Sequence, residues 1–190
     1  MKRSFIAVFF LFLILSHVYT GVSAISVSAK HAVLIDAITG DVLFEKDADT
    51  PVPMASTTKI ATAITVIEAI PLDRIVSIPK EAVGVEGTSA YFKEGEELAV
   101  RDLLYALLLS SANDAAVALA LACDQSISAF AERMNRKAME LDLKSTHFEN
   151  PHGLPSDGHY TTARELALLS AYAMHNPTFA EIVAKNVMEE

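Results

Sequence analysis

The sequence predicts a mixed α/β (α+β) domain that is mostly helical, with one β-hairpin near its N-terminal end. Two short runs of β-type residues, 31–36 and 42–46, stand on either side of a Gly-Asp turn signal. Most of the chain after residue 55 consists of apolar segments with helical length and periodicity. A chain of 190 residues, 52% hydrophobic and 21% charged, has the composition of about one globular domain.

The N-terminus has the pattern of a targeting segment. Lys2 and Arg3 precede an apolar run over residues 5–15, and Val22-Ser23-Ala24 offers a small-x-small cleavage site. We interpret residues 1–24 as a secretory signal peptide; the alternative is a retained membrane anchor. An exported, extracytoplasmic protein is therefore expected, either secreted or held in the cell wall or periplasm. Cleavage would change the formal charge from −9 to −11, and such an acidic chain argues against a nucleic-acid partner.

After the predicted hairpin, two prolines lead into a helix that begins near Ser56 and that Pro71 ends. Ser56 and Lys59 lie three residues apart, so on a helix they project from neighbouring positions and can touch. The helical wheel divides the following residues into an apolar face shared with this pair, Ile60, Ala63, Ile64 and Ile67, and an opposite face of Thr58, Thr62 and Thr65.

A lysine on the apolar side of a helix is expensive to keep charged. Desolvation lowers its pKa, and a lysine that is neutral near pH 7 can act as the base for an adjacent serine. The pair therefore predicts a nucleophile, Ser56, with its activator, Lys59. Because Ser-x-x-Lys is a short pattern, the alternative is a helix cap followed by a solvated lysine.

The remaining elements are mostly helices. Residues 75–97 carry several glycines and are expected to be irregular, with no obvious later strands. Helices are predicted over residues 100–109 and 114–123, from a Ser128 cap to about residue 141, from a Thr162–Glu165 capping box to about His175, and from residue 177 toward residue 185. The third of these has an inner stripe of Phe130, Met134, Ala138 and Leu141. Cys123 is the only cysteine, is expected to be a buried apolar residue, and is assigned no chemistry.

A second polar cluster, Ser111-Ala112-Asn113, lies in the loop between two predicted buried helices. Such a loop can present polar groups into a cleft. The Ser111 hydroxyl can relay a proton to a leaving group, and the Asn113 amide can hold a peptide backbone. The alternative is that both side chains satisfy helix ends.

Four sequence blocks together resemble the serine-type D-Ala-D-Ala carboxypeptidases of peptidase family S11, the low-molecular-mass penicillin-binding proteins. The blocks are Pro53-Met54-Ala55-Ser56-Thr57-Thr58-Lys59, Gly95-Glu96-Glu97 before Leu103-Leu104-Tyr105, Ser111-Ala112-Asn113-Asp114-Ala115-Ala116, and Asn150-Pro151-His152-Gly153-Leu154-Pro155 followed by Gly158-His159-Tyr160-Thr161-Thr162-Ala163. The resemblance covers about residues 28–186 and implies a β-lactamase/transpeptidase-like fold.

The resemblance implies a role for each candidate site residue. Ser56 would be the acylated nucleophile, Lys59 its general base, Ser111 a proton relay to the departing D-alanine, and Asn113 a substrate-binding residue. The reaction would remove the terminal D-Ala from peptidoglycan stem peptides, and β-lactam antibiotics would trap the same serine. Neither a metal nor a cofactor is implied.

One departure from the family pattern limits this expectation. Family members carry a Lys-Thr-Gly strand that binds the substrate carboxylate and completes the oxyanion hole, and these 190 residues contain no Lys-Thr-Gly. Loss of one oxyanion donor costs about 2.7–4 kcal/mol. We expect residues 25–190 to be the N-terminal and central part of a catalytic domain whose C-terminal strands are missing. The alternative is an inactive truncated paralogue or gene fragment that binds peptidoglycan or a wall partner without turnover.

Two other enzyme classes fit the sequence less well. His147, His152 and His159 crowd one region, but Pro151 argues against the regular helix of a zinc-peptidase motif. A class A β-lactamase would have Asp where this chain has Ala112, together with a separate deacylating glutamate. The segment that follows Thr162 is better explained as a capping box and a buried face.

Overall fold

The computed structural model describes residues 25–185, so the predicted signal peptide lies outside the described residues. The predicted hairpin is confirmed: β1 (Ala32–Ile35) pairs antiparallel with β2 (Val42–Lys46), and the register shifts after Leu34. The turn between the strands is held by Asp36, whose carboxylate accepts the N–H groups of Ile38 and Thr39, each at 2.8 Å.

A second antiparallel ribbon corrects the prediction for residues 75–97. Strands β3 (Ile75–Ser77) and β4 (Glu97–Ala99) pair there, with the 3₁₀ turn η2 (Lys80–Ala82) between them. The expectation of no later strands was therefore wrong. Strands of three residues show too little alternation to be recognised, and in β3 only Val76 is buried.

The predicted helices are confirmed, with small shifts at their ends. They are α2 (Thr58–Ala69), preceded by the 3₁₀ turn η1 (Ala55–Thr57), and then α3 (Val100–Leu109), α4 (Asn113–Cys123), α5 (Ile127–Glu140), α6 (Ala163–His175) and α7 (Pro177–Val183). Three members of the predicted inner stripe of α5 are confirmed by the burial of Phe130, Met134 and Ala138. The fourth, Leu141, is only partly buried, because it is the C-cap residue just after the helix ends. Cys123 is half-buried, and burial raises the pKa of its thiol to about 12.

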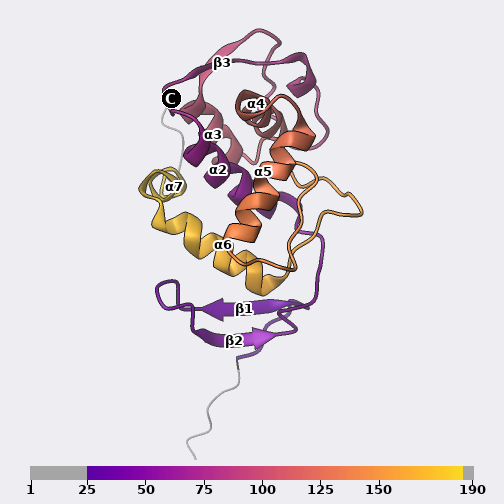
Figure 1. The fold of residues 1–190 in the computed structure, drawn as a ribbon, viewed down its shortest axis with the longest axis vertical. Helices are drawn as coiled ribbons and strands as arrows, with labels where there is room; N and C mark the ends of the chain where they lie inside the picture. Colours follow the sequence, from indigo (N-terminus) through magenta and orange to yellow (C-terminus); the bar gives the residue numbers. More distant parts are fainter. Residues whose placement is uncertain (1–24, 186–190) are drawn as a thin grey trace, which may run out of the picture.

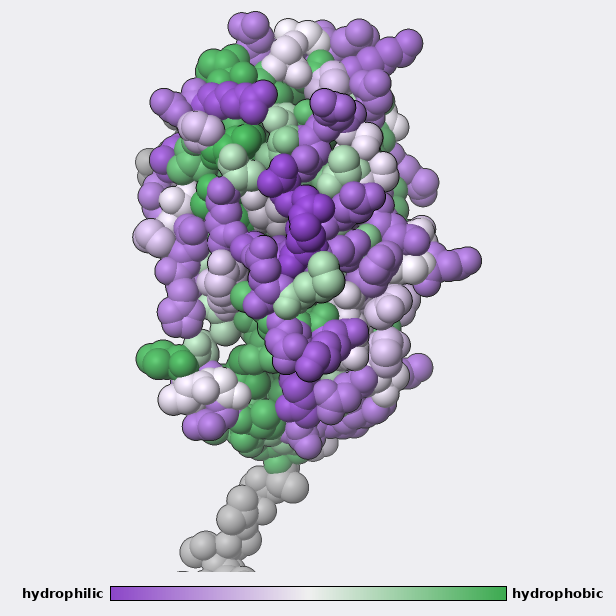
Figure 2. All heavy atoms as spheres, in the orientation of Figure 1, coloured by the Kyte–Doolittle hydropathy of each residue, from purple (hydrophilic) through white to green (hydrophobic). Residues whose placement is uncertain are grey.

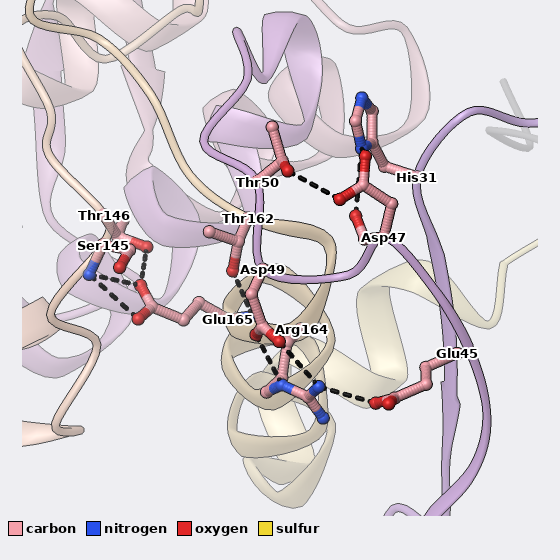
Figure 3. Close-up of polar contacts among 10 residues, drawn as sticks. All are labelled: His31, Glu45, Asp47, Asp49, Thr50, Ser145, Thr146, Thr162, Arg164 and Glu165. Carbon is pink, nitrogen blue, oxygen red and sulfur yellow. Dashed lines mark hydrogen bonds and ion pairs between the residues drawn. The ribbon is translucent and has the colours of Figure 1, made fainter.

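Two helix caps differ from the predicted ones. Helix α5 is capped by Ser126, which accepts the N–H of Ala129, and not by Ser128. At α6, Thr162 accepts the N–H of Glu165 as predicted, but the Glu165 carboxylate does not complete the capping box. It accepts instead from Ser145 and Thr146 in the preceding loop, as Figure 3 shows.

Helix α2 lies at the centre of the molecule and is contacted by α3, α4, α5, α6 and α7 (Figure 1). It is therefore buried on nearly every side, and the division into an apolar and a threonine face was wrong. Thr58, Thr62 and Thr65 are buried, whereas Ile60 and Ile67 are only partly buried. Neighbouring segments supply hydrogen-bond partners to the hydroxyls of Thr58 and Thr62, and these bonds offset the free-energy cost of burying the two polar groups.

The hairpin packs against α6 at one end of the molecule (Figure 1). Arg164 joins the two: its guanidinium contacts Asp49 at 2.7 Å and Glu45 of β2 at 2.6 Å (Figure 3). Apolar side chains gather on the surface at this end, as Figure 2 shows, and exposed hairpin residues include Leu34 and Leu43. In the part of the chain that the structure describes, no single helix is long and apolar enough to cross a membrane, although α4 and α5 together, bent by 85°, pass that test.

Candidate active site

Ser56 is presented to solvent by a strained turn. It lies in η1 directly before α2 and is exposed. The preceding residue, Ala55, has a φ of +47°, in the left-handed region that residues other than glycine rarely adopt. Thr57 fixes the turn by donating its N–H and its hydroxyl to the Met54 carbonyl, at 3.2 and 2.5 Å.

Lys59 is buried beside Ser56, and the residue is only 3% exposed. Its Nζ contacts Ser56 Oγ at 3.2 Å, Asn113 Oδ1 at 2.7 Å and the His152 carbonyl at 2.9 Å. None of these partners is charged, so nothing offsets the desolvation of an ammonium group. Burial accordingly lowers the pKa of Lys59 to about 8.

The two carbonyl-type partners also orient the amine. The Asn113 and His152 oxygens can only accept, so each takes an N–H from Lys59. A neutral amine has two such hydrogens and one lone pair, which is then left for the Ser56 hydroxyl. The arrangement is able to accept the proton of Ser56 as its oxygen attacks a carbonyl carbon.

Asn113 is held in one orientation by the chain before it. Its Nδ2 donates to the Glu86 carbonyl at 2.6 Å, which directs Oδ1 toward Lys59, and its N–H donates to the Thr88 carbonyl at 2.7 Å. Gly87 has a φ of +91°, and a Cβ there would lie 2.7 Å from Asn113 Nδ2. One amide hydrogen of Asn113 and one lone pair are left for another partner.

Ser111 lies near the pair but does not bond to it. Its φ of +56° is in the left-handed region, and it lines an apolar groove of about 470 Å³ together with Ser56 and Lys59. No hydrogen bond within residues 25–185 joins its hydroxyl to either residue. The role of Ser111 as a proton relay stays a prediction. The roles assigned to Ser56, Lys59 and Asn113 also stay predictions.

The loop over residues 149–159 closes the other side of the site. The Pro151 carbonyl accepts from Thr62 at 2.6 Å, and the next carbonyl, of His152, accepts from Lys59. Gly153 has a φ of +89° and packs so closely on η1 that a Cβ would lie 1.9 Å from the Ala55 carbonyl oxygen. Burial and the nearby Lys59 lower the pKa of His152 to about 4, so its ring is neutral at pH 7.

A cleft of about 300 Å³ lies between this loop and the turn that carries Ser56. Ser56, Asn113, His152 and His159 are among its lining residues, together with Gly87 and Thr88. Ser56 is an exposed hydroxyl at the wall of this cleft, and the buried base Lys59 contacts it from behind, which suits nucleophilic attack on a bound carbonyl group.

The crowded histidines have structural partners. His147 Nδ1 contacts the Gly158 carbonyl, and His159 contacts Thr58 and the N–H of Glu149. Within residues 25–185, no three His, Cys, Asp or Glu residues come together in a way that could hold a metal ion.

Comparison with known proteins decides the family. The model of family S11, D-alanyl-D-alanine carboxypeptidase, matches residues 18–189. The chain belongs to this carboxypeptidase family. The resemblance inferred from the four sequence blocks is therefore confirmed.

Relatives of this S11 chain include curated proteins and solved structures. It is 37% identical over 153 residues to D-alanyl-D-alanine carboxypeptidase DacF of Bacillus subtilis, covering 78% of the chain and 39% of the relative. It is 37% identical over 166 residues to D-alanyl-D-alanine carboxypeptidase DacC of Escherichia coli, a match that covers 82% of the chain and 42% of the relative. Penicillin binding protein 6B from Escherichia coli matches with a TM-score of 0.80 at 33% identity, covering 88% of the chain and 58% of that structure.

These matches confirm the transpeptidase-like fold class, and they show that the S11 chain spans about two fifths of the curated relatives' length, 39% and 42%. Two groups in its site were not foreseen: the carbonyls of Glu86 and His152. A main-chain carbonyl has no side-chain signature in the sequence. The one available signal was the Asn-Pro-His-Gly block, which contains His152; nothing comparable marks Glu86.

Proposed function

We propose that the chain forms a Ser56 acyl-enzyme with D-Ala-D-Ala stem peptides of peptidoglycan, the acylation half of a D-Ala-D-Ala carboxypeptidase reaction. The contact of Lys59 Nζ with Ser56 Oγ, made by an amine that has only neutral partners, carries this proposal. Family membership supports the substrate class, since its model is that of a D-alanyl-D-alanine carboxypeptidase.

In the proposed reaction, Lys59 takes the Ser56 proton as Oγ attacks the carbonyl carbon of the penultimate D-Ala. The peptide C–N bond then breaks, and the departing D-alanine nitrogen receives a proton through Ser111, which opens on the same groove as Ser56 and Lys59. Asn113 has one free amide hydrogen with which to orient the peptide backbone. Water finally hydrolyses the ester. A β-lactam would acylate Ser56 by the same attack.

Labelling with a fluorescent penicillin tests the acylation step. We expect covalent label on the wild-type chain, none on Ser56→Ala, and none on Lys59→Arg, because arginine keeps a charge and cannot act as a base. Ser110→Ala, which alters an exposed serine outside the proposed chemistry, is the matched control and should label normally. Label that persists in Ser56→Ala would contradict the proposed nucleophile.

A second candidate function is binding without turnover. It is favoured by one observation, that binding alone needs only the cleft beside Ser56 and the remaining amide hydrogen of Asn113, both of which the described residues supply. Under this alternative, a D-Ala-D-Ala peptide would bind to the unlabelled chain in calorimetry, while no D-alanine would be released on prolonged incubation. Release of D-alanine that depends on Ser56 would exclude it.

The signal-peptide interpretation of residues 1–24 adds a proposal about location. We infer that the protein acts outside the cytoplasm, where peptidoglycan lies. N-terminal sequencing of the protein after expression in a bacterium with a cell wall would test this: a new N-terminus at Ile25 in the extracytoplasmic fraction is expected, and an intact Met1 in the cytoplasm would contradict it.

A further inference from the structure

A chain of three hydrogen bonds runs from Glu149 through His159 and Thr58 to the strained turn that carries Ser56. His159 Nε2 lies 2.8 Å from Thr58 Oγ1, and Thr58 Oγ1 donates to the Ala55 carbonyl at 2.7 Å. At the other side of the ring, Nδ1 lies 3.0 Å from the N–H of Glu149. His159 is only 4% exposed, and Phe148 packs edge-on against its ring with ring centroids 5.8 Å apart.

Two separate constraints select the same tautomer of this ring. The backbone N–H of Glu149 can only donate, so Nδ1 must be the acceptor and carry no hydrogen. Thr58 has a single hydroxyl hydrogen, which it gives to the Ala55 carbonyl, so the His159 contact must be Nε2–H donating to Thr58. The ring is therefore neutral, with its hydrogen on Nε2.

The last bond of this chain ends on the residue that presents the nucleophile. Ala55 is held at a φ of +47°, a conformation that costs on the order of 1–3 kcal/mol and persists only where its surroundings enforce it. Gly153 presses on the same carbonyl from the loop that His159 closes. Because Thr58 starts α2 and Ser56 lies two residues before it, holding the Ala55 carbonyl also sets the direction of the Ser56 side chain.

We propose that His159, in its neutral Nε2–H form, is a positioning residue that holds the Ala55–Ser56 turn through Thr58, and that protonation of the ring releases the turn. A proton added at Nδ1 would face the Glu149 N–H, placing two donors together and opening the base of the loop. This proposal rests on the proposed acylation of Ser56 and adds to it a second titrating group that does not touch the substrate's reacting atoms.

The charges around His159 agree with a neutral ring. Burial, together with His147, lowers its pKa, while the Glu149 carboxylate acts in the opposite direction. On the same loop His152 is neutral at pH 7, and α2 contributes Lys59, one residue after Thr58. Loss of the bonds to His159 is therefore expected only on the acid side of its ordinary titration.

The rate of Ser56 acylation by a fluorescent penicillin, measured from pH about 5 to about 8, tests this proposal. His159→Gln keeps one donor and one acceptor without a titrating ring, so its rate at neutral pH should stay within about threefold of the wild type. His159→Ala should lose on the order of 100-fold, the effect of displacing a reacting group by about 1 Å. His147→Gln, which changes an exposed neighbour, serves as the control.

The shape of the pH profile separates positioning from simple loss of structure. In a plot of the logarithm of the acylation rate against pH, the wild type and every variant that acylates should fall with a slope of one below the pKa of Lys59. At lower pH the slope should approach two only for the wild type and His147→Gln, because only these proteins keep the titrating ring of His159. The proposal is overturned if His159→Gln steepens in the same way, or if His159→Ala labels at the wild-type rate.

A wild-type chain that takes no label would refute the proposed function, and His159 would then be judged by two measurements that need no activity. Nitrogen-15 NMR of the histidine rings should show His159 with a bare Nδ1, and a hydrogen on Nδ1 at neutral pH would overturn the proposal. Hydrogen exchange of the Thr57 and Thr58 amides should be faster in His159→Ala and unchanged in His159→Gln; unchanged exchange in His159→Ala would also overturn it.

Discussion

At the scale of single residues, the site depends on where a buried amine finds its acceptors. Lys59 reaches a hydroxyl, a side-chain amide and a main-chain carbonyl, and no carboxylate. A carboxylate partner would hold the proton on Nζ and make the lysine useless as a base near neutral pH. The neutral partners instead keep the amine in place while leaving its pKa low.

The pKa of Lys59, lowered from 10.5 to about 8, predicts the pH dependence of acylation. Only the neutral amine can accept the Ser56 proton, so the rate should rise with pH by about tenfold per unit up to about pH 8 and then level off. Second-order rate constants for penicillin labelling at several pH values would show this. A rate that does not change with pH between about 6 and 8 would contradict a lysine base.

Gly153 offers a residue-scale test of how tightly the loop packs on the Ser56 turn. Gly153→Ala is expected to lose about 3 kcal/mol or more of unfolding free energy, because a left-handed alanine and a clash with the Ala55 carbonyl add together. Gly84→Ala is the matched control: its φ is +75°, but nothing lies within 4 Å of the added Cβ. It should lose only about 1 kcal/mol.

Denaturant unfolding of the two glycine variants would provide the comparison. Equal losses of stability would show that backbone strain alone matters and that the close approach of Gly153 to the turn contributes nothing.

At the scale of elements, helix ends are decided by which side chain reaches which backbone group. Ser126 and Ser128 both precede the apolar periodicity of α5, and either one fits the sequence rule for a cap. Ser126 has extended backbone angles and accepts the Ala129 N–H at 3.1 Å, whereas Ser128 lies inside the first turn. At α6, the Glu165 carboxylate accepts from Ser145 and Thr146 and so joins the preceding loop to the helix.

The cap of α5 gives an element-scale prediction. Ser126→Ala should lower the free energy of unfolding by about 1 kcal/mol, because the N–H of Ala129 loses its acceptor, while Ser128→Ala should change it by less than about 0.5 kcal/mol. Thermal or denaturant unfolding of both variants measures the difference. A larger loss at Ser128 would mean that the helix begins two residues later than in the structure.

At the scale of the whole molecule, neutral histidines tie stability to pH. The folded-state pKa of His152 is lowered from 6.5 to about 4, chiefly by burial, and that of His159 is lowered as well. Between the unfolded-state pKa of His152, 6.5, and its folded-state pKa, about 4, the unfolded chain binds more protons than the folded chain. Stability is therefore fully present above about pH 6.5 and falls as the pH drops toward about 4.

The free energy of unfolding, measured by denaturant at several pH values in this window, tests the prediction. The double variant His152→Gln/His159→Gln should lose less stability than the wild type between pH about 6.5 and about 4, because its glutamines do not titrate. An identical pH dependence of the two proteins would show that other groups control acid stability.

The fold could be predicted from the sequence where order is local. The hairpin between β1 and β2, the limits of α3 and the inner stripe of α5 follow from period, turn residues and caps within a few positions of one another. The ribbon of β3 and β4 could not be predicted, because its partners are about twenty residues apart and each strand has only three residues. The faces of α2 were assigned wrongly because the assignment assumed one exposed side, and five helices surround it.

The sequence by itself determined the family and the adjacency of Ser56 and Lys59, since a three-residue spacing at a helix start brings two side chains together whatever lies around them. Only the tertiary structure decided how Lys59 is held. Its other acceptors, Asn113 and the His152 carbonyl, are 54 and 93 residues further along the chain. Such contacts depend on how separate segments pack, and a carbonyl is common to every residue, so no local pattern could single them out.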